Sequence, residues 1–183
     1  MAEEIKKNKE ERPQRNNRRE RPVKKEDDGM DKRLVHVRRV TKVVKGGRTM
    51  RFSALVVLGD GKGNVGMGIG KANEVPNAID KATVVAKKSM KKIAIVEGTI
   101  PHETVGKYST TSILMLPAEE GHGVIAGGAA RAVLELAGVK DIVSKSLGSN
   151  TKINVAKATL EALKSERTPA KIAALRGKKV EEL

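Results

Sequence analysis

Hydrophobic and polar positions in the first half of the chain predict three strands and a helix. Runs rich in β-branched residues over 34–44 and 50–58 predict two strands, and Val65, Met67 and Ile69 alternate with glycines in a predicted third. The glycines leave one face of that strand nearly bare, which permits close approach by another backbone or by a bound partner. A helix is predicted from Pro76 to about residue 92, followed by a short strand over 93–96.

The second half of the chain is again predicted to form strands followed by helices, in a different order. Gly106-Lys107 is interpreted as a turn between two extended segments, and Gly138 as the end of a helix that begins through Gly127-Gly128. Ser149 or Asn150 is the expected cap of the next helix. The predicted elements are strands over 99–105 and 109–116, a helix over 125–137, a strand over 141–145, a helix from about 150, and a last helix from Pro169 to about Gly177.

This order predicts an α+β protein of two small domains, β-β-β-α and then β-β-α-β-α. The expected domains are 32–97 and 98–176, and their small cores are expected to pack against each other. Residues 1–31 are nearly all polar, so we expect a disordered charged extension. Residues 177–183 form a predicted tail.

Composition removes several classes of protein. The 183 residues include no Cys and no Trp, and Phe52 and Tyr108 are the only aromatic residues. Disulfides, Cys-bound zinc and thiol nucleophiles are therefore excluded, and the core must consist of Val, Ile, Leu, Ala and Met. No apolar run is long enough to span a membrane and no signal peptide is evident, so we expect a cytoplasmic protein.

The charge points to a polyanionic partner. The net charge is +15, and residues 32–72 hold ten basic residues against Asp60 alone. The lysines and arginines that flank Gly46-Gly47 can neutralise phosphates, and the scarcity of aromatic side chains disfavours stacking on nucleobases. We therefore predict contact with structured RNA. The alternative is a solvated basic loop. The predicted RNA-binding residues are Arg38, Arg39, Lys42, Lys45, Gly46, Gly47, Arg48, Arg51, Lys62, Lys71, Lys87 and Lys88.

Motifs for catalysis are weak. Gly61 to Gly66 matches GxGxxG, but a strand and not a helix follows, so a hairpin turn is favoured over a nucleotide loop. The glycine-rich stretch 121–130 is compatible with protein or RNA contact, with close packing, or with phosphate binding. His36, His102 and His122 lack the spacing of metal ligands. We therefore predict no catalytic residue, no metal and no cofactor.

Several long motifs together resemble the bacterial small-subunit (30S) ribosomal protein five family. The resemblance runs from about residue 31 to the C-terminus, with the motifs in the family's order. They are 44–48, 52–61, 65–71, 74–76, 121–135 and 147–151.

The resemblance implies a double-stranded-RNA-binding-like first domain and a second domain similar to the left-handed β-α-β fold of certain small-molecule kinases. It implies a structural, non-enzymatic protein that binds 16S rRNA, joins head and body of the subunit, contacts ribosomal proteins four and eight, supports translational accuracy and adjoins the mRNA entry. Gly127, Gly128 and Arg131 match the family region that faces protein four. A homo-oligomer is not expected.

Two other hypotheses remain open from the residues alone. One is a nucleotide-dependent small-molecule kinase built on residues 98–176, although a Ser-rich loop and a catalytic Asp are not evident there. The other is a free-standing regulator that binds double-stranded RNA.

Overall fold

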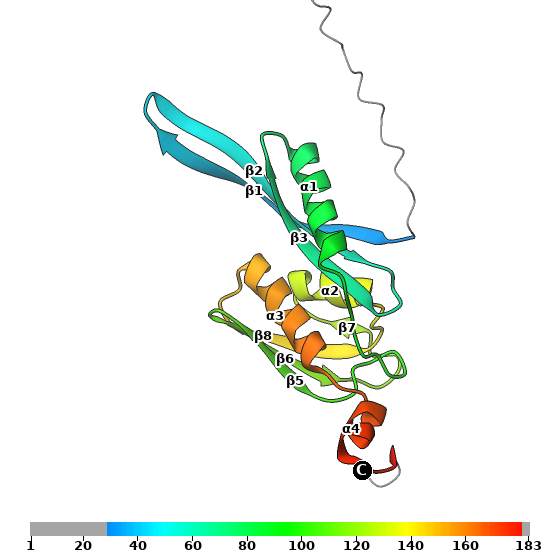
Figure 1. The fold of residues 1–183 in the computed structure, drawn as a ribbon. Coiled ribbons are helices and arrows are strands. Elements are labelled where there is room, and N and C mark those ends of the chain that lie inside the picture. The colour runs from blue at the N-terminus through cyan, green and yellow to red at the C-terminus, as the bar shows by residue number, and fades with distance from the viewer. Residues whose placement is uncertain (1–28, 181–183) are drawn as a thin grey trace, which may run out of the picture.

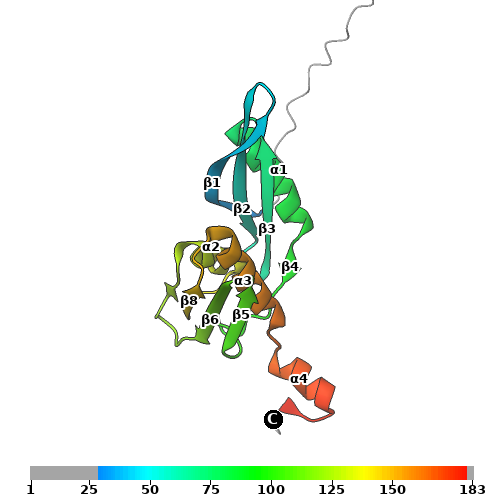
Figure 2. The same ribbon diagram turned by 90° about the vertical axis from the view of Figure 1, so that its left-hand side faces the viewer.

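The computed structural model describes residues 29–180, so most of the predicted extension and the last three residues of the tail lie outside the described residues. Two four-stranded sheets, β1-β2-β3-β4 and β5-β6-β8-β7, form the two domains. The β1–β2 hairpin projects at one end of the molecule and α4 lies at the other (Figures 1 and 2).

The N-terminal domain has the predicted β-β-β-α order. Its antiparallel strands are β1 (Asp31–Val44), β2 (Gly47–Gly59) and β3 (Asn64–Ala72), and α1 (Val75–Lys88) packs on one face of them. Asp31 already pairs with Gly59, so the ordered sheet begins one residue earlier than the predicted domain.

The bare face of β3 is occupied by the backbone of α1. A Cβ added at Gly68 or Gly70 would lie 2.1 or 2.2 Å from the carbonyl oxygen of Ala82 or Ala78. No side chain fits in that space, so the glycines allow the helix to pack directly on the strand. Of the two partners that the sequence allowed for this face, another backbone is the one found.

The predicted C-terminal end of α1 is wrong by about four residues. The helix stops at Lys88, where the Ser89 hydroxyl donates to the Met67 carbonyl of β3 at 2.7 Å. The chain then adds the short strand β4 (Lys91–Lys92) to the edge of β3, whereas the sequence placed a strand over 93–96. Contact with β3 therefore overrides the helical periodicity that continues to Met90.

The C-terminal domain consists of a mixed sheet covered by helices. Strands β5 (Thr104–Tyr108), β6 (Thr111–Pro117) and β8 (Ile142–Gly148) are antiparallel, and β7 (Val124–Ile125) pairs parallel to β8. The helix α2 (Gly128–Ala137) connects β7 to β8, which gives the predicted β-α-β unit. Its left-handed sense stays a prediction. The remaining helices are α3 (Lys152–Ser165) and α4 (Pro169–Arg176).

In this domain the predicted turn at Gly106, the predicted start of α2 and the predicted N-cap of α3 are wrong. Gly106 lies inside β5 because α3 packs against it, with the Ala158 carbonyl oxygen 2.2 Å from an added Cβ; the turn falls at 109–110. The predicted helix over 125–137 begins only at Gly128, since Ile125 pairs with β8. The N-cap of α3 is Thr151, because the backbone of Ser149 is bonded to the turn after β5.

The two domains share one hydrophobic core, as expected from their size. Val57 and Val65 from the first sheet belong to the same buried cluster as Leu134 of α2. In addition, the amides of Gly61 and Gly63 donate to the carbonyls of 136 and 137, at 3.1 and 2.9 Å. These carbonyls end α2 and have no partner within the helix. The GxGxxG segment is thus a hairpin turn that docks the two domains.

Candidate nucleic-acid interface

The basic hairpin extends beyond the rest of its sheet. Pairing of β2 with β3 ends at Phe52 and Ala72, so residues 40–51 form a two-stranded arm with no third strand beside it. Every residue from 41 to 51 is exposed. We call residues 40–51 together with the two adjoining arginines, Arg38 and Arg39, the arm (residues 38–51); it projects from the sheet at the end of the molecule away from α4 (Figure 1).

The register places positive charge on both faces of the arm. Arg38 pairs with Ser53 and Val40 with Arg51, so Arg38, Lys42 and Arg51 share one face. Arg39 pairs with Phe52 and Val43 with Arg48, which places these two arginines on the opposite face, the one that carries α1. An arm charged on both sides can contact phosphates of two RNA segments at once.

The turn at the tip requires glycine. Gly46 and Gly47 have φ of +88° and +148°, values that side chains with a Cβ rarely adopt. A Cβ at either position would meet nothing within 4 Å, so the requirement comes from the backbone conformation and not from packing. The tip therefore presents its backbone, between Lys45 and Arg48, without covering side chains.

The charges of the arm are not neutralised by the protein itself. Arg33–Glu135 and Lys164–Glu161 are ion pairs within residues 29–180, but none of the basic residues of the arm takes part in one there. Arg38, Arg39, Lys42, Lys45, Arg48 and Arg51 are all exposed. This surface is available to an external anion.

The other predicted RNA-binding residues divide into two groups. Lys71 lies on the same face as Arg38 and Arg51, because both Arg38 and Lys71 pair with Ser53. In contrast, Lys62 lies in the β2–β3 turn, and Lys87 and Lys88 lie at the C-terminal end of α1, next to the opposite end of β3. These three lysines are exposed but are not part of the arm.

The three predicted protein-contact residues lie together at the start of α2. Gly127 is the N-cap, Gly128 the first helical residue, and the Arg131 amide donates to the Gly127 carbonyl at 2.8 Å. All three are exposed, and both glycines have open space around an added Cβ. The glycines border a groove of about 320 Å³ that also includes Ser146 and Lys152. Close packing is thus not what requires glycine there.

Sequence reasoning missed two features that depend on the tertiary fold. Arg33 of β1 pairs with Glu135 of α2 across the domain boundary. Lys91, Lys157 and Lys164 line a second groove between the domains. The spacing of 157, 161 and 164 does place them on one face of a helix, but only the packing of α3 beside β3 brings that face to Lys91.

Two carboxylates outside the arm have shifted pKa values. In the described part of the chain no three His, Asp or Glu side chains are placed to hold a metal ion. Burial raises the pKa of Glu166 to about 8. Hydrogen bonds from Asn64 and Lys62 outweigh desolvation and lower the pKa of Asp60, whose carboxylate orders the β2–β3 turn. None of the described helices is long and apolar enough to cross a membrane.

The fold is that of a protein of two α+β domains, and the arm is a basic surface of the kind that nucleic-acid-binding proteins carry. Residues 30–94 match the family model "Ribosomal protein S5, N-terminal domain", and residues 106–176 match "Ribosomal protein S5, C-terminal domain". The chain is 52% identical over 160 residues to proteins named "Small ribosomal subunit protein uS5" from Bordetella pertussis, Bordetella parapertussis and Bordetella bronchiseptica. Each alignment covers 87% of this chain and 92% of the relative.

The chain therefore belongs to the ribosomal protein S5 family. Proteins of this family are structural, non-enzymatic, rRNA-binding constituents of the small ribosomal subunit and work in translation in the cytoplasm. The identification made from the sequence motifs is confirmed, and the hypothesis of a small-molecule kinase is excluded.

Proposed function

We propose that the chain binds 16S rRNA through its arm and holds the head of the small subunit relative to the body. The observation that carries this proposal is the two-faced positive charge of an exposed arm that has no ion pair within residues 29–180. Phosphates of folded RNA supply the complementary charge, and the open backbone at Gly46 and Gly47 permits close approach.

The domain architecture supports a bridging role. The shared core and the hydrogen bonds from Gly61 and Gly63 to the end of α2 make the two domains one packed body. RNA held by the arm is then mechanically coupled to whatever the second domain contacts. We propose that this coupling supports translational accuracy.

The second domain is proposed to contact neighbouring proteins. The exposed Gly127, Gly128 and Arg131 form one patch at the start of α2, which we propose as the contact with ribosomal protein four. The open space at both glycines supports a partner that approaches the backbone closely. Contact with protein eight and a contribution to the mRNA entry are further parts of this proposal, carried by the family resemblance.

Cosedimentation with small ribosomal subunits tests the proposed function. The purified full chain, added to subunits that lack it, is expected to remain in the subunit fraction after a high-salt wash, because protein contacts of the second domain, which do not depend on counterion release, act together with the phosphate contacts. Release of the chain by the wash would favour the free double-stranded-RNA regulator and contradict a structural role.

A further inference from the structure

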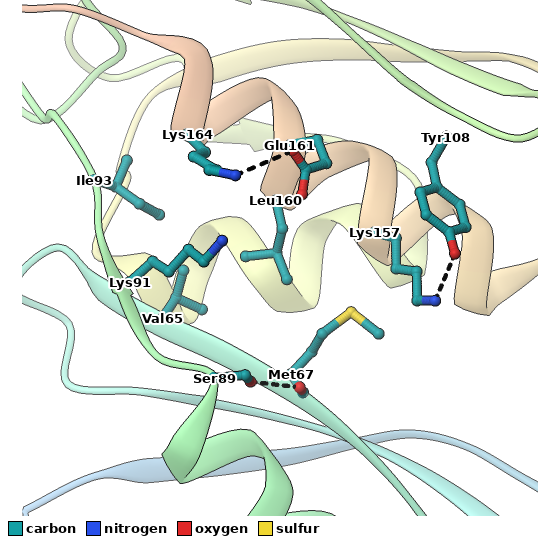
Figure 3. Close-up of a pocket in the computed structure, with 10 residues that line it drawn as sticks. All are labelled: Val65, Met67, Ser89, Lys91, Ile93, Tyr108, Lys157, Leu160, Glu161 and Lys164. Carbon is teal, nitrogen blue, oxygen red and sulfur yellow. Dashed lines mark hydrogen bonds and ion pairs between the residues drawn. The ribbon is translucent and has the colours of Figure 1, made fainter.

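A groove between the two domains combines an apolar floor with a basic rim. It measures about 290 Å³, just below the range of about 300–1,000 Å³ for small-ligand sites, and is bordered by β3, β4, β5 and α3. Figure 3 shows the side chains of Met67 and Leu160 directed into it. The other residues that line it are Val65, Ser89, Lys91, Ile93, Tyr108, Lys157, Glu161 and Lys164.

The rim carries three lysines against one carboxylate. The Lys157 ammonium donates to the Tyr108 hydroxyl at 2.7 Å and lies 4.5 Å from the centre of its ring. The Lys164 ammonium is 3.7 Å from Glu161, in a pair whose side chains are both 52% exposed. Lys91 is exposed and has no ion pair within residues 29–180. An exposed ion pair of this kind is weak, and with three lysines against one carboxylate the rim of the groove has a net positive charge.

The groove lies on the same face of the sheet as one row of arm charges. Val65, Met67, Ile69 and Lys71 alternate with the glycines that contact α1, so all four point away from that helix. Met67 is therefore on the face of Lys71, Arg38 and Arg51, roughly 13 Å along the strand from Lys71.

From this geometry we infer that the interdomain groove is a second RNA contact, in which Lys91 and Lys164 bind backbone phosphates and one unstacked nucleotide packs against Met67 and Leu160. This inference rests on the proposed function, because it assigns a further stretch of the same rRNA. Apolar side chains can receive the face of a base, and ammonium groups at the rim match the phosphates beside it.

RNA explains the groove better than an acidic protein segment does. A single carboxylate side chain would pair with the lysines and leave the apolar floor empty, whereas one nucleotide supplies both an anion and a flat apolar surface. Because the rim includes residues of both domains, RNA bound here also holds β4 against α3.

The test compares two charge-removal variants of the full chain on one 16S rRNA transcript. In Lys91→Ala/Lys164→Ala the slope of log K against log salt is expected to become shallower by about 2, with loss of chemical protection at a distinct set of nucleotides. Lys157 is left intact because it holds Tyr108. The control is Lys140→Ala/Lys145→Ala, which removes two exposed charges outside the groove and the arm.

A reciprocal variant, Glu161→Gln, removes the carboxylate of the rim and is expected to bind the same transcript more tightly with a steeper slope. Circular dichroism checks that each variant remains folded. A wild-type slope and footprint for Lys91→Ala/Lys164→Ala would overturn the groove site.

The arm variant Lys45→Ala/Arg48→Ala, measured on the same transcript, separates the two proposals. If the slope of log K against log salt becomes shallower in the arm variant but not in the groove variant, the proposed function stands and the groove inference fails. The reverse result supports RNA binding in the groove and refutes phosphate binding by the arm. If the groove variant keeps its RNA slope but no longer joins small subunits, the occupant is a protein, which also overturns the inference.

Discussion

Two single residues, Gly46 with its left-handed backbone and Glu166 with its buried carboxyl group, lead to predictions on RNA binding and on stability. At the tip of the arm, Gly46 has a φ of +88° and open space around its Cβ position. Gly46→Val should therefore disturb the turn solely through its backbone, at a cost of about 1–2 kcal/mol for a β-branched residue in the left-handed region.

We predict that Gly46→Val weakens binding to 16S rRNA more than Lys45→Ala or Arg48→Ala does, because it displaces both of these basic side chains together. Thr49→Val, which exchanges one β-branched residue for another at a strand position of the arm, serves as the control. Equal affinity of Gly46→Val and wild type would show that the tip does not approach RNA closely.

Glu166 makes stability depend on pH. It is 6% exposed, and neither carboxylate oxygen has a hydrogen-bond partner within residues 29–180. Burial raises its pKa from 4.5 to about 8, so the folded state binds a proton that the unfolded state has released. The stability from this protonation is fully present below pH 4.5 and is lost as pH rises to about 8.

We predict that Glu166→Gln flattens the fall in Tm between pH 5 and pH 8 and raises Tm most at the alkaline end. Thermal unfolding followed by circular dichroism at several pH values measures this effect, and Glu161→Gln on the exposed face of α3 is the control. Parallel pH profiles for Glu166→Gln and wild type would mean that Glu166 is ionised throughout.

At the scale of elements, α1 is held to β3 by backbone contact. Gly68→Ala would put a Cβ 2.1 Å from the Ala82 carbonyl oxygen, so the helix must move away from the sheet. Overpacking of this kind costs about 1–3 kcal/mol. Denaturant unfolding should show that loss for Gly68→Ala.

The matched control is Gly128→Ala at the first residue of α2, where an added Cβ meets nothing within 4 Å. Alanine favours helix there, so this variant should be as stable as wild type or slightly more stable. Equal stability of both variants would contradict direct packing of α1 on the strand.

The same glycines show what sequence patterns can and cannot predict. Alternation fixed the strand character of β3 and its bare face, and Pro169 and Gly177 correctly bounded the last helix. The turn predicted at Gly106 is wrong, because a glycine alone does not distinguish a turn from a strand position under a helix. The predicted end of α1 is wrong because a hydrogen bond from Ser89 to another strand decides it.

The basic residues illustrate the same limit for the site. The cluster of basic residues around Gly46-Gly47 is visible in the sequence because its members are neighbours in a hairpin. Lys71 joins the cluster only in the structure, where Ser53 pairs with Arg38 on one side and with Lys71 on the other. Charge alone groups Lys62, Lys87 and Lys88 with the arm, but the fold separates these lysines from it. The groove joins residues more than sixty positions apart, which local spacing does not connect.

At the scale of the whole molecule, two small domains act as one body with charge concentrated at one end. The shared core and the α2 contact stabilise the interface, and the arm extends from it with both faces exposed. Rigid attachment matters because an arm on a loose domain could not fix the RNA relative to protein neighbours of the second domain.

The salt dependence of 16S rRNA binding tests the phosphate contacts of the arm most directly. Full-length wild type, Lys45→Ala/Arg48→Ala and the control Lys140→Ala/Lys145→Ala are titrated with the same transcript over a series of salt concentrations. We predict that the slope of log K against log salt becomes shallower by about 2 in the arm variant and stays unchanged in the control. An arm variant with the wild-type slope would contradict phosphate binding by the arm.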